Sequence, residues 1–125
     1  MRNAPLNTFL SLNTGIQESW VIQGTASPEK VAILFNRSMA SAGEGLIVYA
    51  MQRTKVITLG GHSGGYVGYG DIRTKEIPCG KFKLITTTTK WRDKSKYELS
   101  GIPPMRVLKK DIDLVKAAVE ALKAY

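Results

Sequence analysis

Two consecutive segments decide the fold of this chain: VAILF, residues 31–35, and NRSMASAGE, residues 36–44. The first is an unbroken apolar run, which predicts a buried strand over residues 30–36 that is covered on both faces. The small residues of the second allow a sharp turn, and the pattern after them predicts a helix over residues 43–53. Such a strand–turn–helix unit places Ser41 at the start of the helix.

The position of Ser41 supports two interpretations. The first backbone N–H groups of a helix are unpaired and its dipole favours negative charge, so a nucleophile there would have donors for an oxyanion. Alternatively, Ser41 caps the helix, and Glu44, three residues later, completes a capping box. The spacing alone leaves both interpretations open.

The remaining pattern predicts a mixed α/β fold with a β-hairpin and a C-terminal helix. In the first helix, the predicted apolar face consists of Leu46, Ile47, Ala50 and Met51. Strands are expected over residues 56–59, 72–77, 81–88 and 106–108, with the hairpin turning at residues 78–80. The closing helix is expected to begin at a cap, Asp111, and to bury an apolar face made of Ile112, Val115, Val119 and Leu122.

Length and composition indicate one ordinary globular domain. The chain has 125 residues, of which 43% are hydrophobic, and we expect an irregular segment over residues 1–29 followed by a single domain over residues 30–125. No apolar run approaches the roughly 20 residues that span a bilayer. No signal peptide is visible in the chain, so the compartment stays unknown and a longer parent protein could be exported.

The chain is basic, with a net charge of +8. Such an excess raises nucleic acid as a partner, with an affinity that would fall steeply with salt. However, the basic residues are spread along the sequence, and no recognised nucleic-acid-binding motif accompanies them. The densest basic stretch, residues 90–97, is interpreted as a solvated loop, and nucleic acid is not favoured.

The sequence offers little for metal or cofactor binding. Cys79 is the only cysteine and His62 the only histidine, which excludes an intramolecular disulfide and a typical zinc site. Residues 60–70 are rich in glycine but lack the Lys-Ser or Lys-Thr pair and the GxGxxG spacing of phosphate-binding loops. We therefore expect no cofactor, and interpret the loop as a mobile loop beside a cleft or as backbone with which an extended peptide could pair.

Four segments together resemble the C-terminal-processing (tail-specific) serine peptidases, a group that includes the tricorn core protease. In order, SMASAGE (38–44), LGGHSGG (59–65), IPCGKFKL (77–84) and ELSGIPP (98–104) are similar to that family's T/S-A-S-A-x-E, V-G-E-x-T-x-G, L-P-x-G-x-x-L and E-x-x-G-V-x-P-D motifs. The likeness covers roughly residues 30–122. It implies part of a crotonase-like (ClpP-like) ββα core, followed by the hairpin and the closing helix.

The resemblance also implies roles for particular residues. Ser41 would be the acylating nucleophile, the backbone N–H of Ala42 an oxyanion donor, and Glu98 the acid that orients a histidine base. Substrate peptides would extend along the glycine-rich loop by strand addition, at Gly64, Gly65 and Tyr66. The G-K step of family members with a Ser-Lys dyad is replaced by Gly65-Tyr66, so the dyad is not supported.

This chain departs from the family pattern in several features. The D-x-R-x-N-x-G-G motif, the histidine upstream of the serine and the PDZ-like region are absent, and Met105 stands where an aspartate is expected. We therefore expect the C-terminal part of a longer peptidase, inactive alone, whose partners are a peptide or protein substrate and the missing N-terminal part. His62 is the only internal candidate base.

Two further expectations concern what such an incomplete core would do. The alternative function is a non-catalytic peptide- or ligand-binding module on the same fold, in which Ser41 is only a helix cap. An incomplete core would also leave apolar surface exposed, which favours self-association.

Overall fold

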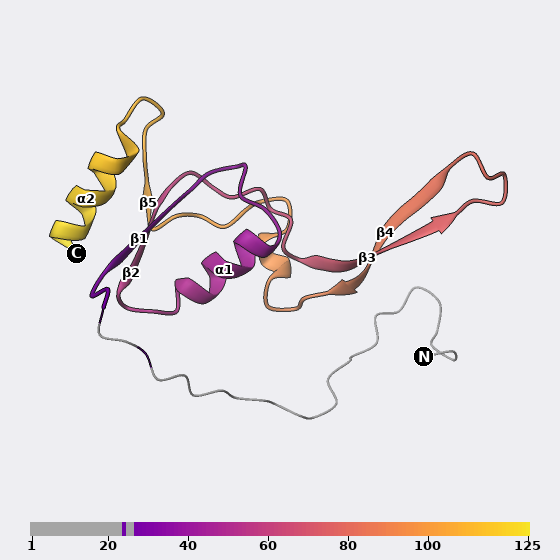
Figure 1. The fold of residues 1–125 in the computed structure, drawn as a ribbon, viewed down its shortest axis with the longest axis horizontal. Helices are drawn as coiled ribbons and strands as arrows, with labels where there is room; N and C mark the ends of the chain where they lie inside the picture. Colours follow the sequence, from indigo (N-terminus) through magenta and orange to yellow (C-terminus); the bar gives the residue numbers. More distant parts are fainter. Residues whose placement is uncertain (1–23, 25–26) are drawn as a thin grey trace.

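The computed structural model describes Gly24 and residues 27–125, so most of the predicted irregular segment 1–29 lies outside the described residues. The elements follow the order β1, α1, β2, β3, β4, a 3-10 helix, β5 and α2 (Figure 1). Their bounds are β1 Val31–Phe35, α1 Ala42–Ala50, β2 Val56–Gly60, β3 Tyr69–Glu76, β4 Lys83–Lys90, η1 Ser95–Tyr97, β5 Arg106–Val107 and α2 Leu114–Ala124. The chain is therefore a mixed α/β protein, as its sequence predicts.

A three-stranded parallel sheet forms the centre of the fold, in the order β1-β2-β5. β1 pairs with β2 in a register that runs from Val31 opposite Val56 to Phe35 opposite Gly60. β5 joins the other edge of β2, where Leu59 lies opposite Arg106. Because β1 and β2 are parallel and consecutive, α1 is the crossover between them, and its first turn lies at the carboxyl end of β1.

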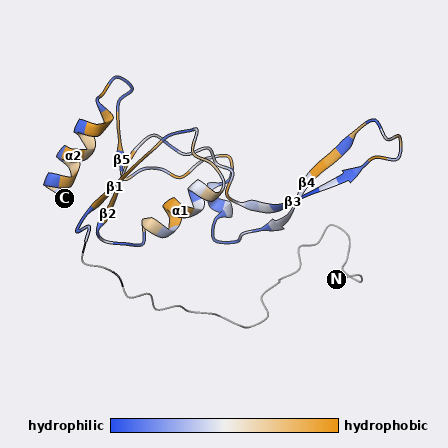
Figure 2. Ribbon diagram, in the orientation of Figure 1, coloured by the Kyte–Doolittle hydropathy of each residue, from blue (hydrophilic) through white to orange (hydrophobic). Residues whose placement is uncertain are grey.

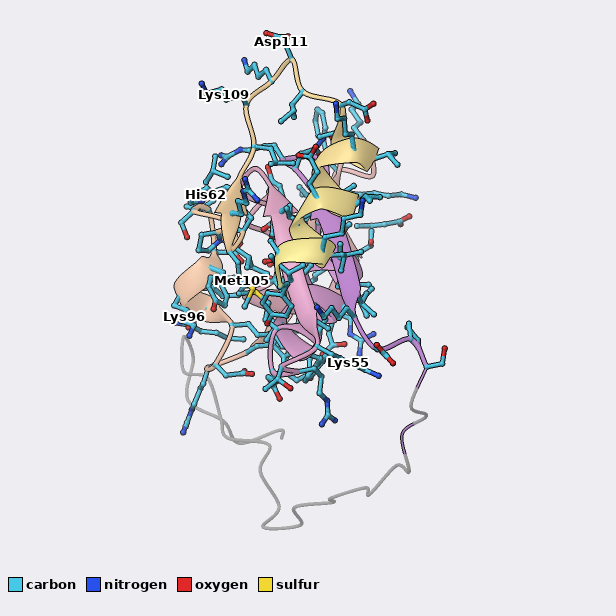
Figure 3. The ribbon with its side chains drawn as sticks, turned by 90° about the vertical axis from the view of Figure 1, so that its left-hand side faces the viewer. Lys55, His62, Lys96, Met105, Lys109 and Asp111 are labelled. Carbon is cyan, nitrogen blue, oxygen red and sulfur yellow. The ribbon has the colours of Figure 1, made fainter. Side chains whose placement is uncertain are left out.

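The two helices cover opposite faces of this sheet (Figures 1 and 3). On the α1 side, the core consists of Phe35, Ile47 and Ile102, with partly buried apolar side chains packed around them. On the other side, α2 lies across β1 and β2 and buries Ala117 and Ala121. Helices therefore lie on both sides of β1, as predicted, but only Phe35 of this strand is fully buried and its other four residues are half-buried.

The packed faces of both helices differ from the predicted ones. In α1, Ile47 is fully buried whereas Leu46 is 64% exposed, because consecutive helical residues point about 100° apart and only one of them can face the sheet. In α2, the predicted face is largely wrong: Ala121 is 2% exposed and Val115 is 70% exposed. Alanines have the smallest side chains in that helix, so they let the backbone of α2 approach the strands closely.

The cap of α2 also differs from the prediction. Asp113, not Asp111, is the N-cap, and its Oδ1 accepts hydrogen bonds from the backbone N–H groups of Val115 and Lys116, both at 3.0 Å. Asp111 lies in the turn before the helix, at the tip that Figure 3 labels. Both residues suit a cap by type, and the hydrogen-bond geometry selects the later one.

The hairpin β3–β4 forms a separate two-stranded antiparallel sheet that projects away from the rest of the fold (Figure 1). Its turn lies where the sequence predicts it: the Gly80 N–H donates to Ile77 O at 2.8 Å, and the Ile77 N–H donates to Phe82 O at 3.1 Å. Nearly every residue of both strands is exposed, and Figure 2 shows apolar positions in them.

The basic stretch over residues 90–97 is more ordered than the solvated loop that its charge predicts. The ammonium group of Lys94 lies 4.9 Å from the ring centroids of both Tyr49 and Trp91, and the residue is buried. Cation–π attraction to aromatic faces offsets part of the cost of removing an ammonium group from water. Lys94 therefore anchors this stretch, including η1, to α1.

Within the described part of the chain, no helix is long and apolar enough to cross a membrane.

Candidate active site

Ser41 is the N-cap of α1 and has an unusual backbone conformation, with φ 52° and ψ −115°. Positive φ is uncommon for a residue with a Cβ, and such strained residues cluster at functional sites. The turn before it is tight, since Asn36 Oδ1 accepts from the Ser38 N–H at 2.9 Å and Asn36 O accepts from the Met39 N–H at 3.0 Å. The strand–turn–helix geometry thus places Ser41 at the start of α1, as the sequence predicts.

Ser41 is exposed, and the capping box with Glu44 is present, as one of the two interpretations of its position expects. The Ser41 side chain pairs with the Glu44 backbone N–H, although too loosely to count as a side-chain cap hydrogen bond. In the other half of the capping box, the Ser41 backbone N–H donates a full hydrogen bond to Glu44 Oε2 at 3.0 Å. Among the described residues, the N–H of Ala42 has no hydrogen-bond acceptor. An exposed hydroxyl beside a free N–H at a helix start can serve acyl-transfer chemistry.

Glu44 is the most connected side chain near Ser41, and it is fully buried. Its Oε1 accepts from the Ser63 hydroxyl at 2.5 Å and from the Gly65 N–H at 2.7 Å. Its Oε2 accepts from the Tyr66 N–H at 2.8 Å, in addition to the bond from Ser41. Each carboxylate oxygen therefore accepts two hydrogen bonds, which satisfies a charge that burial alone would destabilise.

Two opposing effects act on the pKa of Glu44. Burial, the largest effect, raises the pKa, whereas the hydrogen bonds from the Ser63 hydroxyl and from the backbone N–H groups of Gly65, Tyr66 and Ser41 lower it. The hydrogen bonds together prevail, so the pKa lies below the ordinary value of 4.5. Glu44 is consequently a carboxylate at neutral pH.

The glycine-rich loop packs directly on the turn that precedes Ser41. The Gly64 N–H donates to Met39 O at 2.7 Å, and a Cβ on Gly64 would lie 2.9 Å from that same oxygen. Gly65 has φ +84°, and a Cβ there would lie 2.8 Å from the carbonyl carbon of Leu99. Only residues without a side chain allow this approach of backbone to backbone.

Ser63 connects this loop to the core of the protein. Its hydroxyl accepts from the Ile102 N–H at 2.7 Å while it donates to Glu44, and its own N–H donates to Ile102 O at 3.1 Å. A buried hydroxyl can both donate and accept, and here both capacities are used. The chain from Ile102 through Ser63 to Glu44 therefore links the core cluster with the first turn of α1.

Of the three predicted substrate-binding residues, the two glycines are buried and Tyr66 is exposed. Gly64 and Gly65 are buried, and their N–H groups already have acceptors in Met39 O and Glu44 Oε1. An added peptide strand therefore could not take hydrogen bonds from these two donors. Tyr66 also donates its N–H to Glu44, but its side chain is 61% exposed and free to contact a ligand.

Glu98 lies at the end of η1 and is half-buried. Its Oε2 accepts from the Gly68 N–H at 2.7 Å, whereas Oε1 accepts no hydrogen bond from the described residues. The imidazole of His62 is exposed, with Nδ1 3.3 Å from Ser100 O. Within the described part of the chain, neither Glu98 nor His62 forms a hydrogen bond with Ser41.

Sequence reasoning missed the size of the Glu44 network. It identified Glu44 only as a capping partner of Ser41, although the helix glutamate and a hydroxyl residue in the glycine-rich loop belong to two of the ordered motifs. Among the described residues, no cluster of His, Cys, Asp or Glu is suited to hold a metal ion. A hollow beside α2 is lined by Asp111, Ile112, Asp113, Lys116, Ala117 and Glu120, none of which belongs to the Ser41 site.

The comparisons with known proteins leave the family of this chain open. No protein-family model matches the chain, and no curated protein sequence matches it. A solved structure described as "a putative peptidase", from Parabacteroides merdae ATCC 43184, is similar at 21% sequence identity with a TM-score of 0.48. The likeness covers 76% of this chain and 31% of that one, so this chain spans about a third of its length.

Proposed function

We propose that the chain is part of a serine-type peptidase of the C-terminal-processing family, built on a crotonase-like core. The observation that carries this proposal is the conformation of Ser41, which has a positive φ at the start of α1 and is exposed. The ordered motifs between residues 38 and 104 support the same assignment.

The proposed reaction is acyl transfer to Ser41. Its Oγ attacks the carbonyl carbon of a peptide bond while a general base takes the hydroxyl proton, and the carbonyl oxygen becomes an oxyanion. The free N–H of Ala42 donates to that oxyanion. Collapse of the tetrahedral intermediate breaks the C–N bond, the amine leaves with the proton, and water then hydrolyses the acyl-enzyme.

The general base is proposed to be a histidine contributed by a part of the peptidase that this chain does not contain. Glu98 would orient that histidine. Its Oε2 is occupied by the Gly68 N–H, and its Oε1 is available to an imidazole N–H. On this proposal the chain alone hydrolyses peptides very poorly, since removing the base of a triad leaves little catalysis.

The substrate is proposed to be a peptide or protein that lies along the loop at Gly64, Gly65 and Tyr66. The two glycines are buried and their N–H groups are already used, so they would hold the loop in place beneath the substrate rather than contact it. The exposed ring of Tyr66 would supply apolar contact with the substrate.

Labelling with a fluorophosphonate tests the nucleophile directly, because this reagent forms a covalent bond only with an activated serine. The comparison is between the wild-type chain, Ser41→Ala and Ser38→Ala, each alone and within a longer parent peptidase. Ser38 is a matched control, since it is exposed in the same turn. Loss of labelling in Ser41→Ala alone supports the proposal.

A further inference from the structure

The geometry points to Glu44 as a positioning residue that holds Ser41 in its strained conformation and fixes the loop at Tyr66 to it. This inference rests on the proposed function, in which Ser41 is the nucleophile. Glu44 does not touch the reacting atoms, since its carboxylate is buried and its oxygens face backbone N–H groups and Ser63.

The first step of the argument concerns the backbone of Ser41. Its N–H lies 3.0 Å from Glu44 Oε2, and hydrogen bonds to an ionised acceptor are roughly twice as strong as neutral ones. A rotation of Ser41 out of the positive-φ region would carry its N–H away from this oxygen. The carboxylate thus supplies the half of the capping box that is a full hydrogen bond, and this half fixes the Ser41 backbone.

The second step concerns the loop. Oε2 also accepts from the Tyr66 N–H, and Oε1 accepts from the Gly65 N–H and the Ser63 hydroxyl. One rigid group therefore ties both sides of the proposed site, the nucleophile and the Tyr66 loop. Preorganisation of this kind matters, because a displacement of 1 Å at a reacting group can cost about 10²-fold in rate.

The third step concerns the chemical identity of residue 44. A glutamine of the same shape would place an NH₂ donor where the carboxylate has an oxygen, so that N–H groups would face N–H groups. The single oxygen of the amide could accept from only one of the two pairs of donors, and the other pair would lose its acceptor. Glu44→Gln therefore removes the positioning function with little change in volume, which makes it the most informative variant.

The test compares wild type, Glu44→Gln and the control Glu76→Gln, whose carboxylate is exposed on the hairpin. Backbone amide NMR signals of Ser41, Gly65 and Tyr66 report the network without requiring activity. The labelling rate constant of Ser41 with the fluorophosphonate, divided by the folded fraction, reports its reactivity. We expect Glu44→Gln to move the three amide signals together and to lower that rate constant about 10²-fold, and Glu76→Gln to change neither.

Unchanged Ser41 and Tyr66 signals, or an unchanged labelling rate in folded Glu44→Gln, would overturn the inference. If wild type is not labelled within its parent either, the proposed function fails, while the NMR comparison still decides the positioning of Ser41. If Glu44→Gln does not fold, an acid titration of wild type replaces it. The three amides should then shift with one common midpoint, and separate midpoints would contradict a shared carboxylate.

Discussion

Ser41 and Tyr66 donate their backbone N–H groups to the same atom, Oε2 of Glu44, at 3.0 and 2.8 Å. The strained residue at the start of α1 and the exposed ring beside it are therefore parts of one hydrogen-bonded unit. This relationship joins an element that the sequence predicts, the strand–turn–helix, with a loop whose role the sequence left open between a mobile segment and a platform for peptides.

Removal of the Ser63 hydroxyl should destabilise the protein strongly. Ser63→Ala leaves the buried Ile102 N–H without its acceptor and takes one donor from Glu44. A buried polar group without a partner costs about 1–3 kcal/mol, so we expect a loss of that order in the free energy of unfolding, measured by urea denaturation. Ser38→Ala, an exposed control, should change stability by less than about 0.5 kcal/mol.

A side chain at Gly65 should not be tolerated. Gly65→Ala would place a Cβ 2.8 Å from the backbone of Leu99 and would force alanine into φ +84°, so we expect a loss of at least about 1–2 kcal/mol. The matched variant is Gly61→Ala, because a Cβ there meets nothing within 4 Å. Equal midpoints of urea unfolding for the two variants would show that the loop does not pack as described.

Stability should fall as the solution becomes acidic, and Glu44 should account for part of the loss. Its pKa is lower in the folded protein than the ordinary 4.5, so its stabilising contribution is complete above about pH 4.5 and disappears as the pH falls through the folded-state pKa. Urea unfolding of wild type and Glu44→Gln at several pH values measures this. The difference between the two proteins should shrink below pH 4.5, and a difference that stays constant would contradict the assignment.

The packed face of α2 can be tested with one charge at two positions. Ala121→Asp would bury an unpaired carboxylate against β1 and β2, whereas Val115→Asp would place the same group in solvent. We expect the first variant to lose several kcal/mol of stability or to fail to fold. We expect the second to unfold within about 0.5 kcal/mol of wild type. The opposite order would mean that the large apolar residues of α2 face the sheet.

Local sequence patterns were sufficient for the strands and for the position of Ser41. The run Val31–Phe35 is apolar throughout, and small residues follow it, so both the parallel strand and the turn can be predicted from neighbouring residues alone. The same is true of the hairpin, whose turn at residues 78–80 separates two segments rich in strand-forming residues.

Packing details escaped prediction because they depend on residues far apart in the sequence. The apolar spacing in the last helix favours Val115 and Val119, yet the close approach to the sheet selects Ala117 and Ala121. Similarly, the bond between Glu44 and Ser63 depends on how the loop after β2 folds back onto α1. No local pattern contains that information, so the central carboxylate of the site was recognised only as a cap.

The central claim is that Ser41 is a nucleophile, and fluorophosphonate labelling of the proposed parent, a longer protein that contains this chain, tests it most directly. The account predicts that wild type and Ser38→Ala are labelled, that Ser41→Ala is not, and that mass spectrometry places the adduct on Ser41. Absence of any adduct on Ser41 in the folded parent would contradict the claim. Ser41 would then be a strained helix cap in a protein that binds peptides without cleaving them.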